Sequence, residues 1–220
     1  GKLDVLKAFN AKINVTNSNH AAVENADIVL LAVKPWLVKS VLEEISFNAE
    51  KQILITVVAG VPFTEYCNIV GETATIFRVI PNTAISLLES TTLIASYNAS
   101  KDQEQYVLDL FDEMGLAMII SESQMSAATA LTSCGIAYVL KYIHAAVEAG
   151  VEMGIYPKDA QKMVAQSVKG AAELLLQSDT HPAIEIDKVT TPGGLTIKGL
   201  NELEHAGFSS AIIRAMKASR

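Results

Sequence analysis

Short runs of apolar residues, bounded by polar ones, recur through the first half of the chain. They are rich in β-branched side chains, which is typical of strands buried on both faces of a sheet. The five runs span residues 27–33, 53–59, 74–80, 92–95 and 117–120. Helical periodicity lies between them, near residues 36–46, 62–70 and 101–114. This alternation predicts an α/β fold with a parallel sheet covered by crossover helices.

After residue 122 the pattern becomes helical throughout. Apolar residues recur at helical spacing over residues 124–154 and 158–177, and again from Ile197 to Met216. The sequence therefore predicts one domain over residues 1–122 and an all-α domain over residues 123–220. The apolar stripe of the second half is wide, which favours helices that pack against a second copy of the chain. The alternative is an ordinary monomeric bundle.

The stretch from Val189 to Phe208 carries the most specific chemistry. Thr191 and Thr196 flank a Pro-Gly-Gly turn, and an amphipathic pattern starts directly after it. A helix N-terminus offers free N–H donors and a partial positive charge, so it can hold a small carboxylate without an arginine. Taken alone, the Pro-Gly-Gly segment favours a plainer interpretation, a tight turn before a helix that Thr191 or Thr196 caps.

The whole stretch reads Thr-Thr-Pro-Gly-Gly-X-Thr-Ile, then Gly-Leu, Leu-Glu and Gly-Phe, and it resembles the C-terminal signature of the pyrroline-5-carboxylate reductases. Further blocks resemble that family in its own order, and together they cover nearly the full chain. These blocks are Ala32–Pro35, Val58–Val61, Arg78–Thr83 and Ala130–Tyr138.

The resemblance implies a fold and a reaction. The fold is a partial Rossmann-type sheet domain that binds NAD(P), followed by an all-helical domain for dimerisation and substrate binding. The reaction is hydride transfer from NADPH or NADH to the C=N carbon of 1-pyrroline-5-carboxylate, which gives L-proline. Members of this family form homodimers through their helical domains and often assemble further.

The resemblance also implies which residues meet the substrate. Thr191, Gly193, Gly194 and Leu195 would bind its carboxylate, Thr191 through the hydroxyl and Gly194 and Leu195 through backbone N–H groups. Thr196 and Thr191 are the expected catalytic residues, with the Thr196 hydroxyl reaching the ring nitrogen. A threonine hydroxyl is too weak an acid to protonate an imine alone. It would therefore orient a protonated ring or pass a proton from water.

The expected cofactor contacts lie where the strands end, as ligands do in open parallel sheets. By resemblance they are Asn19, Ala32, Val33, Lys34, Pro35, Val58, Ala59, Gly60 and Asn82. Some of them have an equally plain structural interpretation: Asn19 as a helix cap, Asn82 as a turn former after proline, and Lys34 as a solvated lysine. Arg78 falls inside a strand, which favours an internal salt bridge over a substrate contact.

The sequence departs from the family in two places. No Gly-x-Gly-x-x-Gly follows a strand, so we expect residues 1–220 to lack the family's N-terminal strand and phosphate-binding loop and to bind the nicotinamide cofactor poorly. Ile136 stands where the family has proline. This change predicts a straighter helix and leaves the shape of the pocket open.

Composition bears on partners and setting. The net charge is −7 without a basic cluster, which excludes nucleic acid and anionic membrane surfaces as expected partners. Cys67 and Cys134 lack metal or redox spacing, so we expect a reducing, cytoplasmic setting and no metal site. An uncharged run in the second half, over about residues 127–140, is shorter than the roughly 18–20 residues of a membrane span.

Two alternative functions stay open. One is a related reductase that acts on another cyclic imine or on a β-hydroxyacid; the latter would need a catalytic lysine on the long helix, where Lys141 lies past the Gly135–Tyr138 block. The other is a non-catalytic helical oligomerisation module that has lost its nucleotide site.

Overall fold

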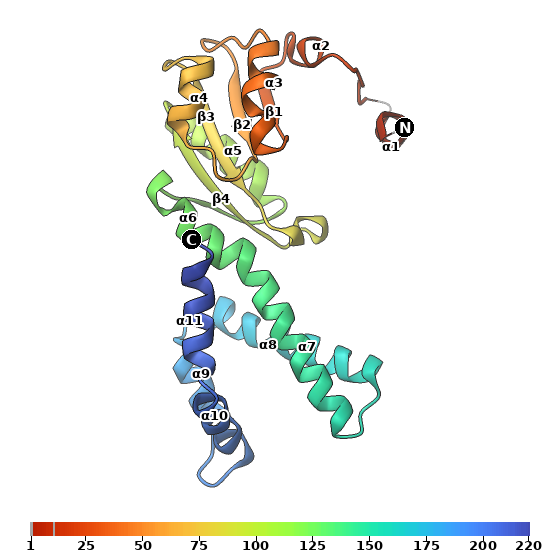
Figure 1. Ribbon diagram of the computed structural model, residues 1–220, viewed down its shortest axis with the longest axis vertical. Helices are drawn as coiled ribbons and strands as arrows, with labels where there is room; N and C mark the ends of the chain where they lie inside the picture. Colours follow the sequence, from red (N-terminus) through yellow and green to blue (C-terminus); the bar gives the residue numbers. More distant parts are fainter. Residues whose placement is uncertain (1, 11) are drawn as a thin grey trace. The chain divides into compact units, whose positions relative to one another are not determined.

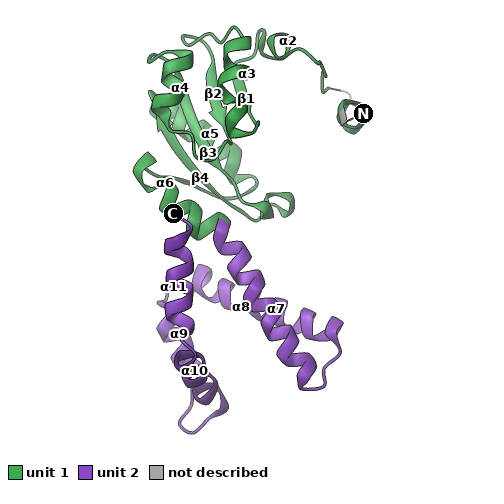
Figure 2. Ribbon diagram, in the orientation of Figure 1, with its two compact units in different colours: residues 1–133 green, residues 134–220 purple. Residues whose placement is uncertain are grey.

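A computed structural model describes residues 2–10 and 12–220, and it divides the chain into two compact units, residues 1–133 and 134–220 (Figure 2). The first unit extends past residue 122 because the segment that follows still packs on the sheet. Met125 is 3% exposed, and Ala128 packs against the same core.

The first unit is built on one sheet with the strand order β1-β2-β3-β4-β5 (Figure 1). The strands are β1 (Ile28–Leu31), β2 (Ile53–Thr56), β3 (Thr75–Ile80), β4 (Ser90–Tyr97) and β5 (Gly115–Ile119). All five lie where the apolar runs predicted them. The sheet is mixed, since β4 runs antiparallel to β3 and parallel to β5. Only residues 81–89 join β3 to β4, which is too short for the crossover that a parallel pair needs.

Helices cover both faces of this sheet, and alternate residues of the strands divide between two apolar clusters. In β3, Ile76 belongs to the cluster that includes α3 and α4, whereas Phe77 belongs to the one that includes α5. The helical elements of this unit are α1 (Lys2–Phe9), α2 (Asn19–Val23), η1 (Pro35–Leu37), α3 (Val38–Glu44), α4 (Phe63–Val70), η2 (Thr83–Leu87), α5 (Lys101–Asp112), η3 (Glu122–Gln124) and α6 (Met125–Thr129).

A π-helical turn, Ala130–Cys134, follows α6 and leads into α7 (Gly135–Glu152). The Thr132 hydroxyl donates to the Ala128 carbonyl within it, at 3.0 Å. Ile136 lies in the first turn of α7, directly after the irregular segment. The helical run is therefore interrupted beside the position where the family's proline would stand.

The second unit is all-helical, as the periodicity predicts. After α7 come α8 (Pro157–Ser178), α9 (Pro182–Lys188), α10 (Leu195–His205) and α11 (Phe208–Ala218). The short helix α9 was not among the expected helices. It is seven residues long, begins at a proline, and is capped by the His181 Nδ1, which accepts from the Ala183 N–H.

The helices of this unit leave much apolar surface exposed. Leu140 on α7 is 59% exposed and Leu174 on α8 is 53% exposed. The helical run Glu122–Glu152 is long and apolar enough to cross a bilayer, with a mean hydropathy of 1.3 over its most apolar window, so the expectation that the apolar run here is too short for a span was wrong on length. An apolar helix face that packs on a second protein chain has the same length and composition.

Candidate active site

Three strand ends meet at one edge of the sheet in the first unit. Because β1, β2 and β3 are parallel, their carboxyl ends lie side by side, with Leu31 opposite Thr56 and Thr56 opposite Arg78. The segments that leave these ends are residues 32–35, 57–60 and 81–82. The structure thus brings all of the expected cofactor residues except Asn19 to a single edge.

This edge presents mainly backbone and small side chains. Ala32, Ala59 and Gly60 are exposed, whereas the Val58 side chain is buried in the core and leaves only its main chain for a ligand. Gly60 has φ +82°, a conformation that favours glycine, and open space where a Cβ would stand. An edge of this kind suits main-chain contacts with a ligand, since ligands of open sheets bind beyond the carboxyl ends of strands.

The side chain of Asn82 is committed to protein contacts. Its Oδ1 accepts from the Ala84 N–H at 3.0 Å, and its Nδ2 donates to the Thr132 carbonyl at 3.2 Å. The backbone N–H of Asn82 donates to the Ser90 hydroxyl. Asn82 therefore forms the turn and caps η2, while also fixing the π-helical turn to the sheet. A direct contact with the nicotinamide stays a prediction.

Asn19 lies away from the strand edge. Its Nδ2 donates at 3.0 Å to Glu44, the last residue of α3, whereas the other end of α3 follows the edge. Asn19 does not cap α2, because the Ser18 side chain accepts from the Ala21 N–H and fills that role. Its contact with the adenine half of the cofactor stays a prediction.

Arg78 forms the internal salt bridge that its place in β3 predicted. Its Nη1 lies 2.6 Å from a carboxylate oxygen of Glu122, and its side chain is 8% exposed. The neighbouring Tyr66 is fully buried, and burial raises the pKa of its hydroxyl above the ordinary value, against smaller lowering effects of the Thr56 hydrogen bond and the Arg78 charge. Tyr66 is therefore a neutral phenol at pH 7, and it hydrogen-bonds Thr56 at 2.8 Å.

The second unit holds the loop of the expected substrate residues. A tight turn closes where the Gly194 N–H donates to the Thr191 carbonyl at 3.0 Å, and Gly193 takes φ +73° within it. α10 then begins at Leu195, with Gly194 as N-cap and without a capping side chain. Neither Thr191 nor Thr196 caps this helix. Both threonines are exposed.

The turn determines which backbone N–H groups are free to bind a ligand. The Gly194 N–H already has a protein acceptor, whereas a helix N-terminus leaves its first N–H groups without intrahelical carbonyls. Those groups belong to Leu195 and the residues after it. An ideal Cβ on Gly194 would stand 2.5 Å from the Thr191 Oγ1, so the absence of a side chain lets Thr191 fold against the turn. The loop therefore joins an exposed hydroxyl to an uncapped helix start.

Comparison with known proteins gives one family for both units. The family model for pyrroline-5-carboxylate reductase dimerisation matches residues 122–220, and one for NADP oxidoreductase, coenzyme F420-dependent, matches residues 2–60. Pyrroline-5-carboxylate reductase 2 of Dictyostelium discoideum is 39% identical, over 93% of this chain and 74% of its own length. The Methanosarcina acetivorans pyrroline-5-carboxylate reductase is 36% identical, over 98% and 83%. This chain belongs to the pyrroline-5-carboxylate reductase family.

Other relatives agree with this assignment. Pyrroline-5-carboxylate reductase 1 of Dictyostelium discoideum is 40% identical over 94% of the chain, which spans 40% of that relative's length. The Plasmodium falciparum pyrroline carboxylate reductase, solved with NADP bound, has a TM-score of 0.87 and 32% identity over 94% of this chain and 79% of its own. A Coxiella burnetii pyrroline-5-carboxylate reductase has a TM-score of 0.90 and 29% identity, over 99% and 82%.

The family confirms the expected fold class and reaction class. The relatives named above are pyrroline-5-carboxylate reductases, and the dimerisation model covers the helical half, including the apolar run after residue 122. Lys141, which a hydroxyacid enzyme would use, lines an apolar groove of about 590 Å³ between α7, α10 and α11. Its neighbours there include Tyr142, Leu203 and Phe208.

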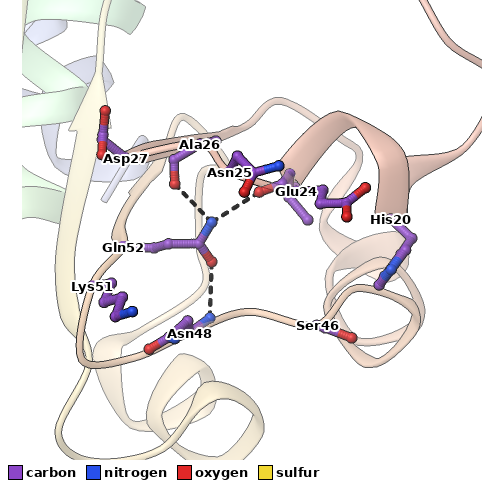
Figure 3. Close-up of a pocket in the computed structure, with 10 residues that line it drawn as sticks. His20, Glu24, Asn25, Ala26, Asp27, Ser46, Asn48, Lys51 and Gln52 are labelled. Carbon is purple, nitrogen blue, oxygen red and sulfur yellow. Dashed lines mark hydrogen bonds between the residues drawn. The ribbon is translucent and has the colours of Figure 1, made fainter.

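A polar cavity of about 410 Å³ lies at the opposite edge of the sheet, where β1 and β2 begin, and it contains none of the expected site residues (Figure 3). The Gln52 side chain points into this cavity, and both its amide nitrogen and its amide oxygen form hydrogen bonds. Its Nε2 donates to the carbonyls of Val23 and Ala26, and its Oε1 accepts from the Asn48 N–H (Figure 3). The sequence analysis did not single out Gln52, because a polar residue before a strand gives no local indication of these hydrogen bonds.

Proposed function

We propose that this protein reduces 1-pyrroline-5-carboxylate to L-proline, with the Thr191–Thr196 loop as the substrate site. The observation that carries the proposal is the uncapped start of α10, directly after a turn that exposes two threonine hydroxyls. A helix N-terminus of this kind favours a carboxylate through its free N–H groups and its partial positive charge. 1-Pyrroline-5-carboxylate carries one carboxylate and one imine nitrogen.

The roles of the loop residues follow from this arrangement. The N–H groups of Leu195 and Thr196 bind the substrate carboxylate, and the Thr191 hydroxyl adds a further donor. Gly193 and Gly194 shape the turn, with the Gly194 N–H held by the Thr191 carbonyl. The Thr196 hydroxyl hydrogen-bonds the ring nitrogen and passes to it a proton from water, or orients a ring that is already protonated.

The cofactor supplies the hydride when it is bound. Ala32, Val33, Lys34 and Pro35 contact it where β1 ends, largely through main-chain atoms. Where β2 ends, the main chain of Val58, Ala59 and Gly60 does the same. Asn82 supports this edge through its turn, and Asn19 is the proposed contact on the adenine side. These residues would hold the ribose and nicotinamide half of the cofactor. Residues 1–220 contain no Gly-x-Gly-x-x-Gly loop that would hold its phosphates.

The protein acts as a homodimer in this proposal, formed through its helical half. The exposed apolar faces of α7 and α8 and the dimerisation family model support a second copy of the chain as the partner.

The cytoplasm is the proposed setting, because Cys67 and Cys134 are both free thiols. Fractionation of cells tests the setting, and recovery in an oxidising compartment would contradict it.

Substitution of Thr196 tests the catalytic role. We expect Thr196→Ala to lower kcat by about a hundredfold, the lower range for loss of a positioned proton donor, while the Kd for NADP⁺ changes less than twofold. Steady-state oxidation of NADPH with 1-pyrroline-5-carboxylate and calorimetry with NADP⁺ give the two values.

Thr190→Ala is the matched control. The Thr190 hydroxyl donates to the Ile186 carbonyl of α9 at 2.7 Å and has no proposed substrate contact, so kcat should stay within about twofold of the unmodified protein. Unchanged turnover in Thr196→Ala would remove Thr196 from the mechanism.

A further inference from the structure

Glu122 receives two strong donors on one carboxylate oxygen. The Arg78 Nη1 lies 2.6 Å from the Glu122 Oε1, and the backbone N–H of Phe63 donates to the same oxygen at 2.7 Å. The three residues are far apart in the sequence, in β3, in η3 and at the first position of α4. The fold alone brings them together, since no local sequence pattern links them.

The contact with Phe63 fills a place that the local sequence leaves empty. α4 begins after Pro62, its N-cap residue, which offers no capping side chain. The first N–H groups of a helix need acceptors, and a carboxylate there is favoured further by the partial positive charge. Glu122 therefore serves as the N-terminal cap of α4 from 59 residues away along the chain.

Arg78 holds this carboxylate in place and also contacts the same helix start. Its guanidinium carbon lies 5.7 Å from the centroid of the Phe63 ring. Its Nε is buried without a hydrogen-bond partner among the residues described, so Glu122 supplies the charge that compensates this cation. The Glu122 side chain is 36% exposed, whereas that of Arg78 is 8% exposed, so removal of Glu122 would leave a buried guanidinium without its charge partner.

Both contacts converge at the end of the short loop from Val57 to Pro62. The other end of that loop is also fixed, because the Thr56 hydroxyl hydrogen-bonds Tyr66 and accepts from the Val58 N–H at 3.3 Å. Between these anchors lie the exposed residues Ala59 and Gly60, which the proposed function assigns to the cofactor. The position of Ala59 and Gly60 thus depends on Glu122.

We propose that Glu122 is a positioning residue for cofactor binding: its carboxylate, held by Arg78, caps α4 and fixes the Val57–Pro62 loop at the cofactor edge. The inference rests on the proposed function for the identity of the ligand, though the cap itself does not. Glu122 acts through Phe63 and the loop, and it touches neither substrate nor cofactor in this proposal.

Three variants of the full-length protein test it: Glu122→Ala, Glu122→Gln and, as the control, Glu43→Gln. Glu43 pairs with Lys39 at 3.8 Å on the surface of α3, so its substitution also removes one paired carboxylate. The readouts are hydrogen exchange at the Phe63 amide, the Kd for NADP⁺ by calorimetry and the KM for 1-pyrroline-5-carboxylate.

For Glu122→Ala we expect exchange at Phe63 to accelerate about tenfold and the Kd for NADP⁺ to rise about tenfold, the scale of a lost helix cap. The KM for the substrate should stay within twofold. Glu122→Gln keeps an oxygen acceptor and should recover part of both losses. Glu43→Gln should change none of the three.

Exchange at Phe63 as slow as in the unmodified protein, or an unchanged Kd, would overturn the proposal. If Glu122→Ala does not fold, the Glu122→Gln values decide, and a Kd equal to that of the unmodified protein overturns it. The exchange measurement needs no cofactor. If the unmodified protein binds no NADP⁺, the proposed function fails, while exchange at Phe63 still decides whether Glu122 caps α4.

Discussion

At Gly194 the absence of a side chain lets Thr191 lie against the turn before α10. An alanine Cβ there would stand 2.5 Å from the Thr191 Oγ1 and 3.0 Å from its carbonyl oxygen. The backbone of Gly194, at φ −66° and ψ 172°, suits any residue. The steric conflict with Thr191 is therefore the main obstacle to substitution.

We expect Gly194→Ala to displace Thr191 and to raise the KM for 1-pyrroline-5-carboxylate about tenfold, roughly the loss of one hydrogen bond to a charged group. Gly199→Ala, inside α10, is the control. Gly199 has open space around it, and alanine should stabilise α10 by about 0.5–1 kcal/mol. Steady-state kinetics and urea unfolding measure the two effects. A KM equal to that of the unmodified protein would show that Thr191 does not bind substrate.

Single residues also show where sequence reasoning succeeds and where it ends. The salt bridge of Arg78 was predictable, because a charge inside a buried strand needs a partner. Glu122 as that partner was not, since it lies 44 residues away and only the fold brings the two together. Asn82 was expected at the cofactor or in a turn, and the structure shows the turn together with a bond to Thr132 that no local pattern indicates.

Among the elements, β5 depends on the glycine at its first residue. Gly115 has φ +127°, and a Cβ there would lie 2.2 Å from the Ser90 carbonyl oxygen, inside the β4–β5 pair. A side chain is excluded both by backbone strain and by contact with a rigid main-chain atom. In the part of the chain that the structure describes, β5 is the outermost strand of the sheet and pairs with β4.

Gly115→Ala should therefore destabilise the protein by about 3 kcal/mol or more, the sum of backbone strain and overpacking. Gly154→Ala is the matched control. Gly154 also has positive φ but open space around it, so its substitution should cost only the strain, about 1–2 kcal/mol. Urea unfolding measures both free energies. Equal losses in the two variants would contradict the close packing of β5 on β4.

The elements themselves were predicted well where the apolar pattern is strong. All five strands and the long helices α7 and α8 lie where the apolar pattern placed them. The predicted parallel sheet was wrong at β4, which runs antiparallel to β3 because only residues 81–89 join the two strands. The apolar pattern locates the strands but does not give their directions. The π-helical turn and α9 were not predicted, because one turn of irregular helix and a seven-residue helix leave little periodic signal.

For the molecule as a whole, the helical half determines the expected assembly. Only small residues, Gly135, Gly150 and Ala160, are buried in this half among the residues described, whereas many large apolar side chains are exposed. Burial of such surface against a second copy is the main stabilising effect available to it, at about 25 cal/mol per Å² of apolar area.

We therefore expect the full-length protein to be a dimer, or an assembly of dimers, at micromolar concentration. The molar mass of the sedimenting species should be twice that of one chain, or a multiple of the dimer mass. Sedimentation velocity over a range of concentrations gives this value. A single species with the mass of one chain across that range would contradict a dimer formed through the helical half.

In the proposed function this protein makes proline from 1-pyrroline-5-carboxylate. The most direct measurement is the amount of L-proline formed by the purified full-length protein with NADPH and 1-pyrroline-5-carboxylate, alongside the NADPH consumed. We predict one proline for each NADPH oxidised, with formation lost when either reactant is omitted. A folded protein that binds NADP⁺ and yet forms no proline would rule out this function.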